Sequence, residues 1–303
     1  MSAELPIGVA SAIGAMPFAR AVDAVDFVVE QLPQLPSAPP LDLDANCHEV
    51  DDLDADTLAG IDAFVTRLQG RSEPVVASLT GPITLDLRLR EAGYAPGAAA
   101  EIALGAVQRV GGWLLARLGS AMPEAGLLLF LDEPGLHHSM HPSFPLKPAA
   151  VERRLSEVVA HLDDLGGRVT VGLNLGARAD WAMLLRTGVG ALAAPLTAQL
   201  ETAATEVSRF LDSGGVIGWG AVPVDEPLGA SPERLWKRLS AVWCDMTQGG
   251  ADPMLLRERS IIVPSGPLGA YGLSQAERAV QLAQELAVKV WHQSLGVRLS
   301  IGA

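Results

Sequence analysis

Two adjacent carboxylates, Asp132 and Glu133, follow a run of apolar residues that ends at Leu131. Carboxylates directly after a buried strand are costly unless they face a polar cleft or a cationic group, so the pair is a candidate functional site. Because successive side chains of a strand point to opposite sides, we expect only one of the two to enter the cleft. The alternative for each carboxylate is a structural role, as a helix cap or an acceptor for a loop amide.

Three of the six histidines follow closely, at His137, His138 and His141. On a helix His137 and His141 would share a face, and with a neighbouring carboxylate they could bind a metal such as zinc. Pro142 and Pro145 favour an irregular loop instead, in which the imidazoles are solvated or contact a substrate. The sequence leaves both alternatives open.

Other polar, aromatic and glycine residues lie where further apolar runs end. Thr80, before Gly81 and Pro82, offers a hydroxyl to a ligand or to a helix N-terminus. Trp219 between two glycines is either a core residue or a platform for a flat ligand. Gly14 would let a ligand approach the backbone closely. No dinucleotide-binding, phosphate-loop, serine-hydrolase or zincin motif occurs in the chain.

Short apolar runs alternate with segments of helical period, which is the pattern of β/α repetition around a parallel sheet. Strands are predicted over Ile7–Ile13, Val75–Leu79, Gly126–Leu131, Arg168–Leu173, Gly190–Ala194, Val216–Val222 and Ser260–Val263, with a weaker one near Leu41–Leu43. Helices are predicted over Ala19–Gln31, Ala55–Leu68, Pro96–Leu118, Pro148–Leu165, Ala179–Leu185, Leu200–Ser213, Pro232–Thr247 and Ser274–Ser294. We therefore predict one (β/α)₈ barrel domain over residues 1–303, with its site at the carboxyl ends of the strands.

The composition narrows the classes of partner. Thirty-five acidic against 22 basic residues give a formal charge of −13, which disfavours binding to nucleic acid and to anionic membranes. No apolar run reaches the length of a membrane span, and the N-terminus does not resemble a signal peptide, so we expect a cytoplasmic protein. Cys47 and Cys244 are the only cysteines and do not form a CxxC pair.

In the order and spacing of its motifs the chain resembles the cobalamin-independent methionine synthase C-terminal barrel and short stand-alone members of the uroporphyrinogen decarboxylase and methionine synthase superfamily. The resemblance covers nearly the whole chain and rests on several segments: 13–17 (IGAMP), 32–36 (LPQLP), 80–84 (TGPIT), 131–134 (LDEP), 180–181 (DW) and 218–223 (GWGAVP). It implies a small-molecule pocket formed by the backbone around Ile13 and Gly14 and by Asp132, which matches the carboxylate that binds the amino group of homocysteine.

The resemblance fails at the zinc ligands of that family. Asn174 and Gly176 stand where the family has a His-x-Cys, and Ser265 and Gly266 stand at the second cysteine. Residues 190–195 (GALAAP) lack the family's carboxylate. Zinc is therefore not expected, and Asn174 and Ser265 become candidate ligand contacts.

Three hypotheses follow. The first is a methyltransferase-related protein that works without the zinc site and binds an amino-acid-like, folate or corrinoid-linked ligand. Its methyl donor would be a folate or a corrinoid, and a corrinoid protein would be a partner in the second case. The second is a non-catalytic barrel that binds a ligand or a protein partner. The third is a metal-dependent enzyme built on His137, His138 and His141. In the first two, the candidate ligand contacts are Ile13, Gly14, Thr80, Asp132, Glu133, Asn174, Trp219 and Ser265.

Overall fold

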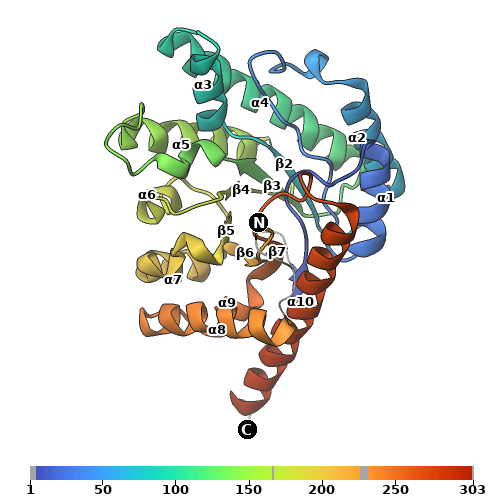
Figure 1. Cartoon of the computed structure of the whole chain (residues 1–303), viewed down its shortest axis with the longest axis vertical. Coiled ribbons are helices and arrows are strands. Elements are labelled where there is room, and N and C mark those ends of the chain that lie inside the picture. Colours follow the sequence, from blue (N-terminus) through green and yellow to red (C-terminus); the bar gives the residue numbers. More distant parts are fainter. Residues whose placement is uncertain (1–4, 166, 226–230, 302–303) are drawn as a thin grey trace.

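The computed structural model describes residues 5–165, 167–225 and 231–301, the last seven of them without their side chains. Parallel strands form one curled sheet with helices around it (Figure 1). The order across the sheet is β1-β7-β6-β5-β4-β3-β2. The strands are β1 Val9–Ala10, β2 Val75–Thr80, β3 Leu127–Asp132, β4 Val169–Asn174, β5 Ala191–Pro195, β6 Val216–Val222 and β7 Ser260–Pro264. The predicted barrel fold is confirmed.

The helices cover the outer face of this sheet (Figure 1). They are α1 Ala21–Gln31, α2 Ala55–Arg67, α3 Pro82–Glu91, α4 Pro96–Ala121, α5 Pro148–Asp164, α6 Trp181–Leu185, α7 Ala204–Asp212, α8 Pro232–Gln248, α9 Leu255–Glu258 and α10 Leu273–Ile301. None of the helices in the described ranges is long and apolar enough to cross a membrane.

The predicted eighth strand near Leu41–Leu43 is present only as a chain segment that pairs with β2 at two isolated bridges, Ser37 with Val76 and Leu41 with Leu79. The backbone N–H of Leu41 donates to the Ser78 carbonyl at 3.0 Å, and that of Thr80 to the Leu41 carbonyl at 2.9 Å. Prolines at 36, 39 and 40 have no N–H, so a regular ladder cannot form here. On its other side this segment is joined to the β1 region by the Ser11 hydroxyl, which donates to the Leu35 carbonyl at 2.8 Å.

Side chains alternate between two cores. The inner core fills the barrel with valine, isoleucine, leucine and alanine side chains and Phe130, and it includes Ile13, Val76, Ala193 and Val263. The larger outer core lies between the sheet and the helices. A filled interior leaves the carboxyl ends of the strands as the place for a site.

Two helices, α3 and the single-turn α9, were not predicted. For residues 82–91 no element was predicted, since their sequence PITLDLRLRE alternates apolar and polar residues as a strand does. The segment is α3, which starts with proline at its first turn and buries residues on several sides. Burial around the helix removes the amphipathic pattern by which a surface helix is recognised.

Candidate functional site at the barrel mouth

A pocket of about 280 Å³ opens at the carboxyl ends of the strands. We call it the mouth pocket, and it is lined by Ile13, Gly14, Ala15, Pro40, Leu41, Asp42, Thr80, Arg88, Asp132, Pro134, Asn174, Leu175, Gly176, Ser265, Gly266 and Pro267. The structure brings six of the eight predicted contacts together here: Ile13, Gly14, Thr80, Asp132, Asn174 and Ser265. Their convergence follows from the parallel sheet, because all its strands end at the same rim.

Asp132 is a half-buried carboxylate that lines this pocket. As the last residue of β3, it accepts a hydrogen bond from the side-chain amide of Asn174, the last residue of β4, at 2.8 Å. Burial raises the pKa of the Asp132 carboxyl to about 6, while hydrogen bonds from Asn174 and Ser78 oppose the rise. A carboxylate with such a pKa is ionised at neutral pH and is well placed to receive a cationic group.

Gly14 fixes the loop that follows β1. Its φ of +94° lies in the left-handed region, and an added Cβ would lie 3.0 Å from Cβ of Pro267. The next residue, Ala15, accepts a backbone hydrogen bond from Leu268 at 2.9 Å, so the first and last loops of the mouth are joined. A side chain at position 14 would push these loops apart.

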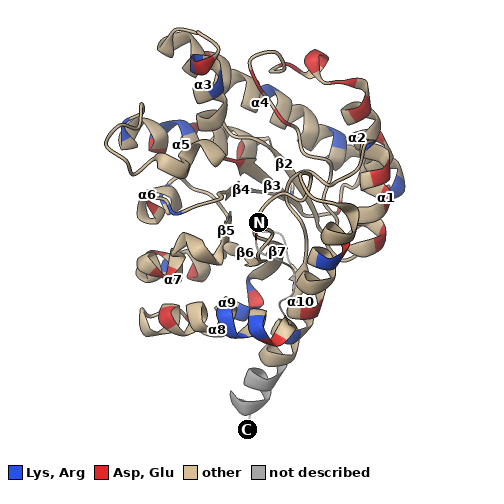
Figure 2. Cartoon of the chain, in the orientation of Figure 1, with Lys and Arg blue, Asp and Glu red and all other residues tan. Residues whose placement is uncertain are grey.

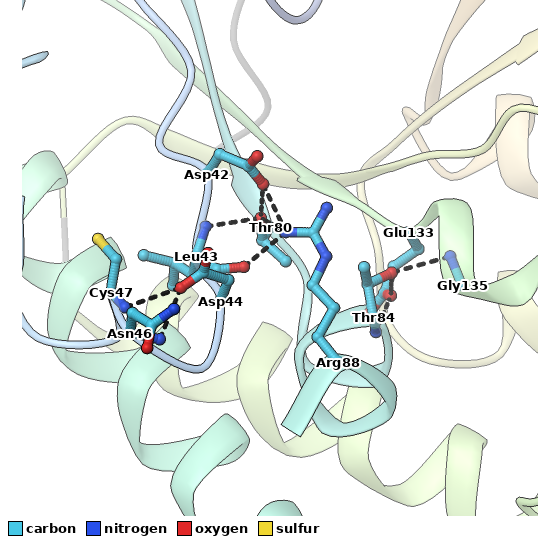
Figure 3. Close-up of polar contacts among 10 residues, drawn as sticks. All are labelled: Asp42, Leu43, Asp44, Asn46, Cys47, Thr80, Thr84, Arg88, Glu133 and Gly135. Atoms are coloured by element: carbon cyan, nitrogen blue, oxygen red, sulfur yellow. Dashed lines mark hydrogen bonds and ion pairs between the residues drawn. The ribbon is translucent and has the colours of Figure 1, made fainter. Parts of the chain in front are cut away.

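Two charged residues of the mouth pocket, Asp42 and Arg88, were missed in the sequence. Figure 3 shows them around Thr80, whose hydroxyl donates to Asp42 at 2.9 Å and accepts from the Leu43 backbone N–H at 2.9 Å. Nη1 of Arg88 donates to the Asp42 carboxylate at 2.5 Å and to the Leu43 carbonyl at 2.6 Å. Arg88 was overlooked because α3 was not expected, and Asp42 because its segment was weak as a strand.

Glu133 does not line the mouth pocket, and its prediction as a ligand contact is corrected. The carboxylate is 1% exposed and accepts hydrogen bonds from the backbone N–H groups of Ile83 and Thr84, at 2.9 and 2.7 Å, and from the Thr84 hydroxyl at 2.6 Å. These groups begin α3, so Glu133 caps that helix from outside it (Figure 3). The structural alternative considered for this carboxylate is the one observed.

Trp219 is also corrected. It is 2% exposed, belongs to the outer core and packs against Trp243 of α8 with ring centroids 6.2 Å apart. Its indole N–H donates to the Ser260 hydroxyl at 2.8 Å. The side chain therefore points away from the barrel interior, because alternation along β6 places position 219 on the outer face.

The three clustered histidines line a separate groove of about 740 Å³ beside the mouth pocket. The two hollows share Arg88 and Pro134. Nδ1 of His141 lies 2.7 Å from the Ser143 hydroxyl, and the rings of His137 and His138 contact each other edge to face. Within the described ranges, no three His, Cys, Asp or Glu side chains come together in a way that would hold a metal ion, so the arrangement gives the hypothesis of a His-rich metal centre no support among those residues.

No protein-family model and no curated protein sequence matches the chain. A B12-independent methionine synthase from Shewanella sp. W3-18-1, solved in complex with selenomethionine, aligns with 96% of this chain and 100% of its own, with a TM-score of 0.64 and 9% sequence identity. The methylaspartate ammonia lyase of Clostridium tetanomorphum aligns with 98% of this chain and 60% of its own, with a TM-score of 0.56 and 10% identity. The chain is a TIM barrel. At these identities the similarity shows the fold and nothing finer.

The residues at the mouth do not fit a zinc ion of the methionine synthase type. Gly176 has no side chain, the Asn174 amide donates to Asp132, and the Ser265 hydroxyl accepts the Val224 backbone N–H at 3.1 Å. None of these supplies the thiolate or imidazole that zinc prefers. We therefore expect less than one tenth of an equivalent of zinc in purified protein, measured by elemental analysis. Stoichiometric zinc whose removal by a chelator lowers the melting temperature would contradict this.

Proposed function

We propose that this barrel binds a small amino-acid-like molecule in the mouth pocket and is related in function to methyltransferases of the methionine synthase type. The observation that carries the proposal is Asp132, a half-buried carboxylate with a pKa of about 6 that lines the pocket and accepts from the Asn174 amide. A ligand ammonium group would offset the cost of burying this charge. Apolar residues supply most of the remaining lining, which suits an uncharged side chain.

The size of the pocket supports a ligand of this class. Its volume of about 280 Å³ is below the range of roughly 300–1,000 Å³ for drug-sized molecules, so a single amino acid is a better match than a whole folate or corrinoid. A larger methyl donor would have to extend into the histidine-lined groove, which adjoins the pocket at Arg88 and Pro134. The methionine synthase of similar fold was solved with selenomethionine, an amino acid of this size class.

Methyl transfer in this proposal would not pass through a metal-bound thiolate. The acceptor atom would lose a proton to a base and form a bond to the methyl carbon, while the N–CH3 bond of a methylfolate or the Co–CH3 bond of a methylcorrinoid breaks. The electron pair of the broken bond would stay on the folate nitrogen, which takes up a proton, or on the cobalt. Among the described residues that line the mouth pocket, the available bases are Asp132 and Asp42. A barrel that only binds its ligand differs in one result, because it gives no methylated product when acceptor and donor are incubated with it.

Asp132→Asn tests the binding site with almost no change in shape. We expect L-methionine or L-homocysteine to stabilise the wild-type protein, and the substitution to weaken binding roughly tenfold to a hundredfold through loss of a charge-assisted contact. Thermal shift and titration calorimetry at pH 7.5 give the measurement. Asp245→Asn, on the exposed surface of α8, is the matched control and should bind as the wild type does. Equal affinity in wild type and Asp132→Asn would refute the proposal.

A further inference from the structure

Arg88 uses one side of its guanidinium group to hold the chain and leaves the other side without a partner. Its three hydrogen bonds, to the Asp42 carboxylate, the Leu43 carbonyl and, at 3.4 Å, the Thr80 hydroxyl, all come from Nη1. Among the described residues, no hydrogen bond is made by Nε or Nη2 of this arginine. In Figure 3 these two atoms lie on the side of the group away from Leu43.

The unused Nε and Nη2 atoms form the edge that matches a carboxylate. Their N–H groups run parallel and can donate to both oxygens of one carboxylate, which is the strong bidentate arrangement of arginine. The Nη1 bonds and the ion pair with Asp42 fix the orientation of the group before any ligand arrives. A donor that is already ordered loses little conformational entropy when it binds.

The location of Arg88 adds a second argument. It lines both the mouth pocket and the histidine-lined groove, and its side chain is 33% exposed. Arg88 also lies near enough to Asp132 to lower the pKa of that carboxyl, whereas Asp42 raises it. Two other acidic side chains line the mouth pocket or the histidine-lined groove near Arg88, Asp42 in the pocket and Glu91 in the groove. The side chain of Asp42 is 77% exposed, so water screens its charge. Asp132 and Arg88 thus present opposite charges to one pocket.

We propose that Arg88 binds the carboxylate of the ligand through Nε and Nη2, while Asp132 binds its ammonium group. The ligand class is then a free α-amino acid with an uncharged side chain, and amines, amino acid amides and peptides joined through that carboxylate are poor ligands. This inference rests on the proposed function, because it assumes that the mouth pocket holds an amino-acid-like molecule. It adds the group that selects a zwitterion over a simple cation.

The test compares L-methionine with L-methioninamide by titration calorimetry at pH 7, using the full chain. The two probes differ only at the carboxylate. Wild type should prefer methionine roughly tenfold to a hundredfold, as expected for a bidentate charged contact. In Arg88→Gln the preference for methionine should fall below about threefold. Arg88→Lys keeps the positive charge but loses the two parallel N–H groups, so its preference should lie between those of Arg88→Gln and wild type.

Arg117→Gln is the matched control for the loss of one arginine. Arg117 lies on α4, pairs with Asp62 and does not line the mouth pocket, so the preference for methionine should persist. If Arg88 only held residues 42 and 43, its loss would weaken both probes equally and leave their ratio unchanged, which would overturn the inference. Equal binding of both probes to wild type would also overturn it while leaving the proposed function standing. No binding of either probe would refute both.

Discussion

Replacing Glu133 with alanine is expected to lower the free energy of unfolding by about 3 kcal/mol or more, because two buried N–H groups and a hydroxyl lose their acceptor together. Ile83 and Thr84 have no other acceptor at the start of α3, since the first N–H groups of a helix lack partners within it. The Thr84 hydroxyl also accepts the Gly135 N–H at 3.0 Å, so the loss would spread to the segment after β3. Urea denaturation followed by circular dichroism measures the change.

An exposed helix cap provides the comparison for this prediction. Asp54 caps α2 by accepting from the Thr57 N–H at 2.9 Å, in an exposed setting where water can replace the carboxylate. Asp54→Ala should therefore cost only about 1 kcal/mol. If Glu133→Ala lowers the free energy of unfolding by no more than Asp54→Ala does, the buried cap stabilises the protein no more than an exposed cap, and the prediction is wrong. Gly81→Ala should be similarly harmful, because its Cβ would lie 2.4 Å from the Glu133 carboxylate.

The cap at Glu133 also bears on the proposed ligand site. Thr84 and Arg88 lie one turn apart on α3, so the carboxylate that fixes the first turn of this helix sets the position from which Arg88 reaches the mouth pocket. Glu133 is thus a positioning residue and does not contact the ligand. Its neighbour Asp132 does line the pocket, and the two adjacent carboxylates have different roles because the end of β3 points them to opposite sides.

The contribution of Asp132 and Glu133 to the free energy of unfolding is expected to fall as the pH rises from about 4 to 7. Burial raises the pKa of Asp132 from 3.8 to about 6 and that of Glu133 from 4.5 to about 7. Between the unfolded and folded pKa values the native state binds more protons than the unfolded state, so the free energy of unfolding decreases with increasing pH. Each unit of such a difference corresponds to about 1.4 kcal/mol, so each carboxyl contributes on the order of a few kcal/mol.

Asp132→Asn isolates one carboxyl of the pair from the other acidic groups of the chain. Several exposed carboxylates, such as Glu49 beside Arg109, have lowered pKa values and contribute the opposite trend at lower pH. We therefore expect the variant to gain stability relative to wild type between about pH 4 and pH 6 and to keep a constant difference above pH 7. Denaturation midpoints across this range give the result. A difference that does not vary with pH would show that Asp132 titrates normally in the folded protein.

Acidic residues lie along the chain beside the mouth pocket. Figure 2 shows Asp and Glu positions, coloured red on the ribbon, along α1, α2 and the loop that precedes α2. That loop carries Asp44, Glu49, Asp51 and Asp52, and Asp42 begins it at the edge of the mouth pocket. A negative surface beside the entrance favours the approach of ligands with a cationic group and disfavours polyanions.

The amino-acid sequence determined the order of strands and helices and the edge of the sheet at which polar residues gather. Apolar runs of strand length, separated by segments of helical period, can satisfy their buried backbone only in a parallel sheet covered by helices, so the barrel followed from local pattern. Ile13, Gly14, Thr80 and Asp132 were found because each lies where an apolar run stops. Asn174 and Ser265 were found because they stand at the zinc-ligand positions of the family that the chain resembles.

Only the tertiary structure decided what each of these side chains faces. The sequence could not show that Glu133 turns to α3 and Asp132 to the pocket, because both follow the same strand and the capped N–H groups lie about 50 residues earlier. It hid α3 behind an alternating pattern, and with it Arg88, since a helix buried on several sides has no polar face. The sequence also could not show the direction of the Trp219 side chain. That direction depends on which residues of β6 face the helices and on the position of α8 against this strand. The local sequence pattern determines which helices and strands form. The direction of a side chain at the end of a strand depends on contacts between elements that are far apart in the chain.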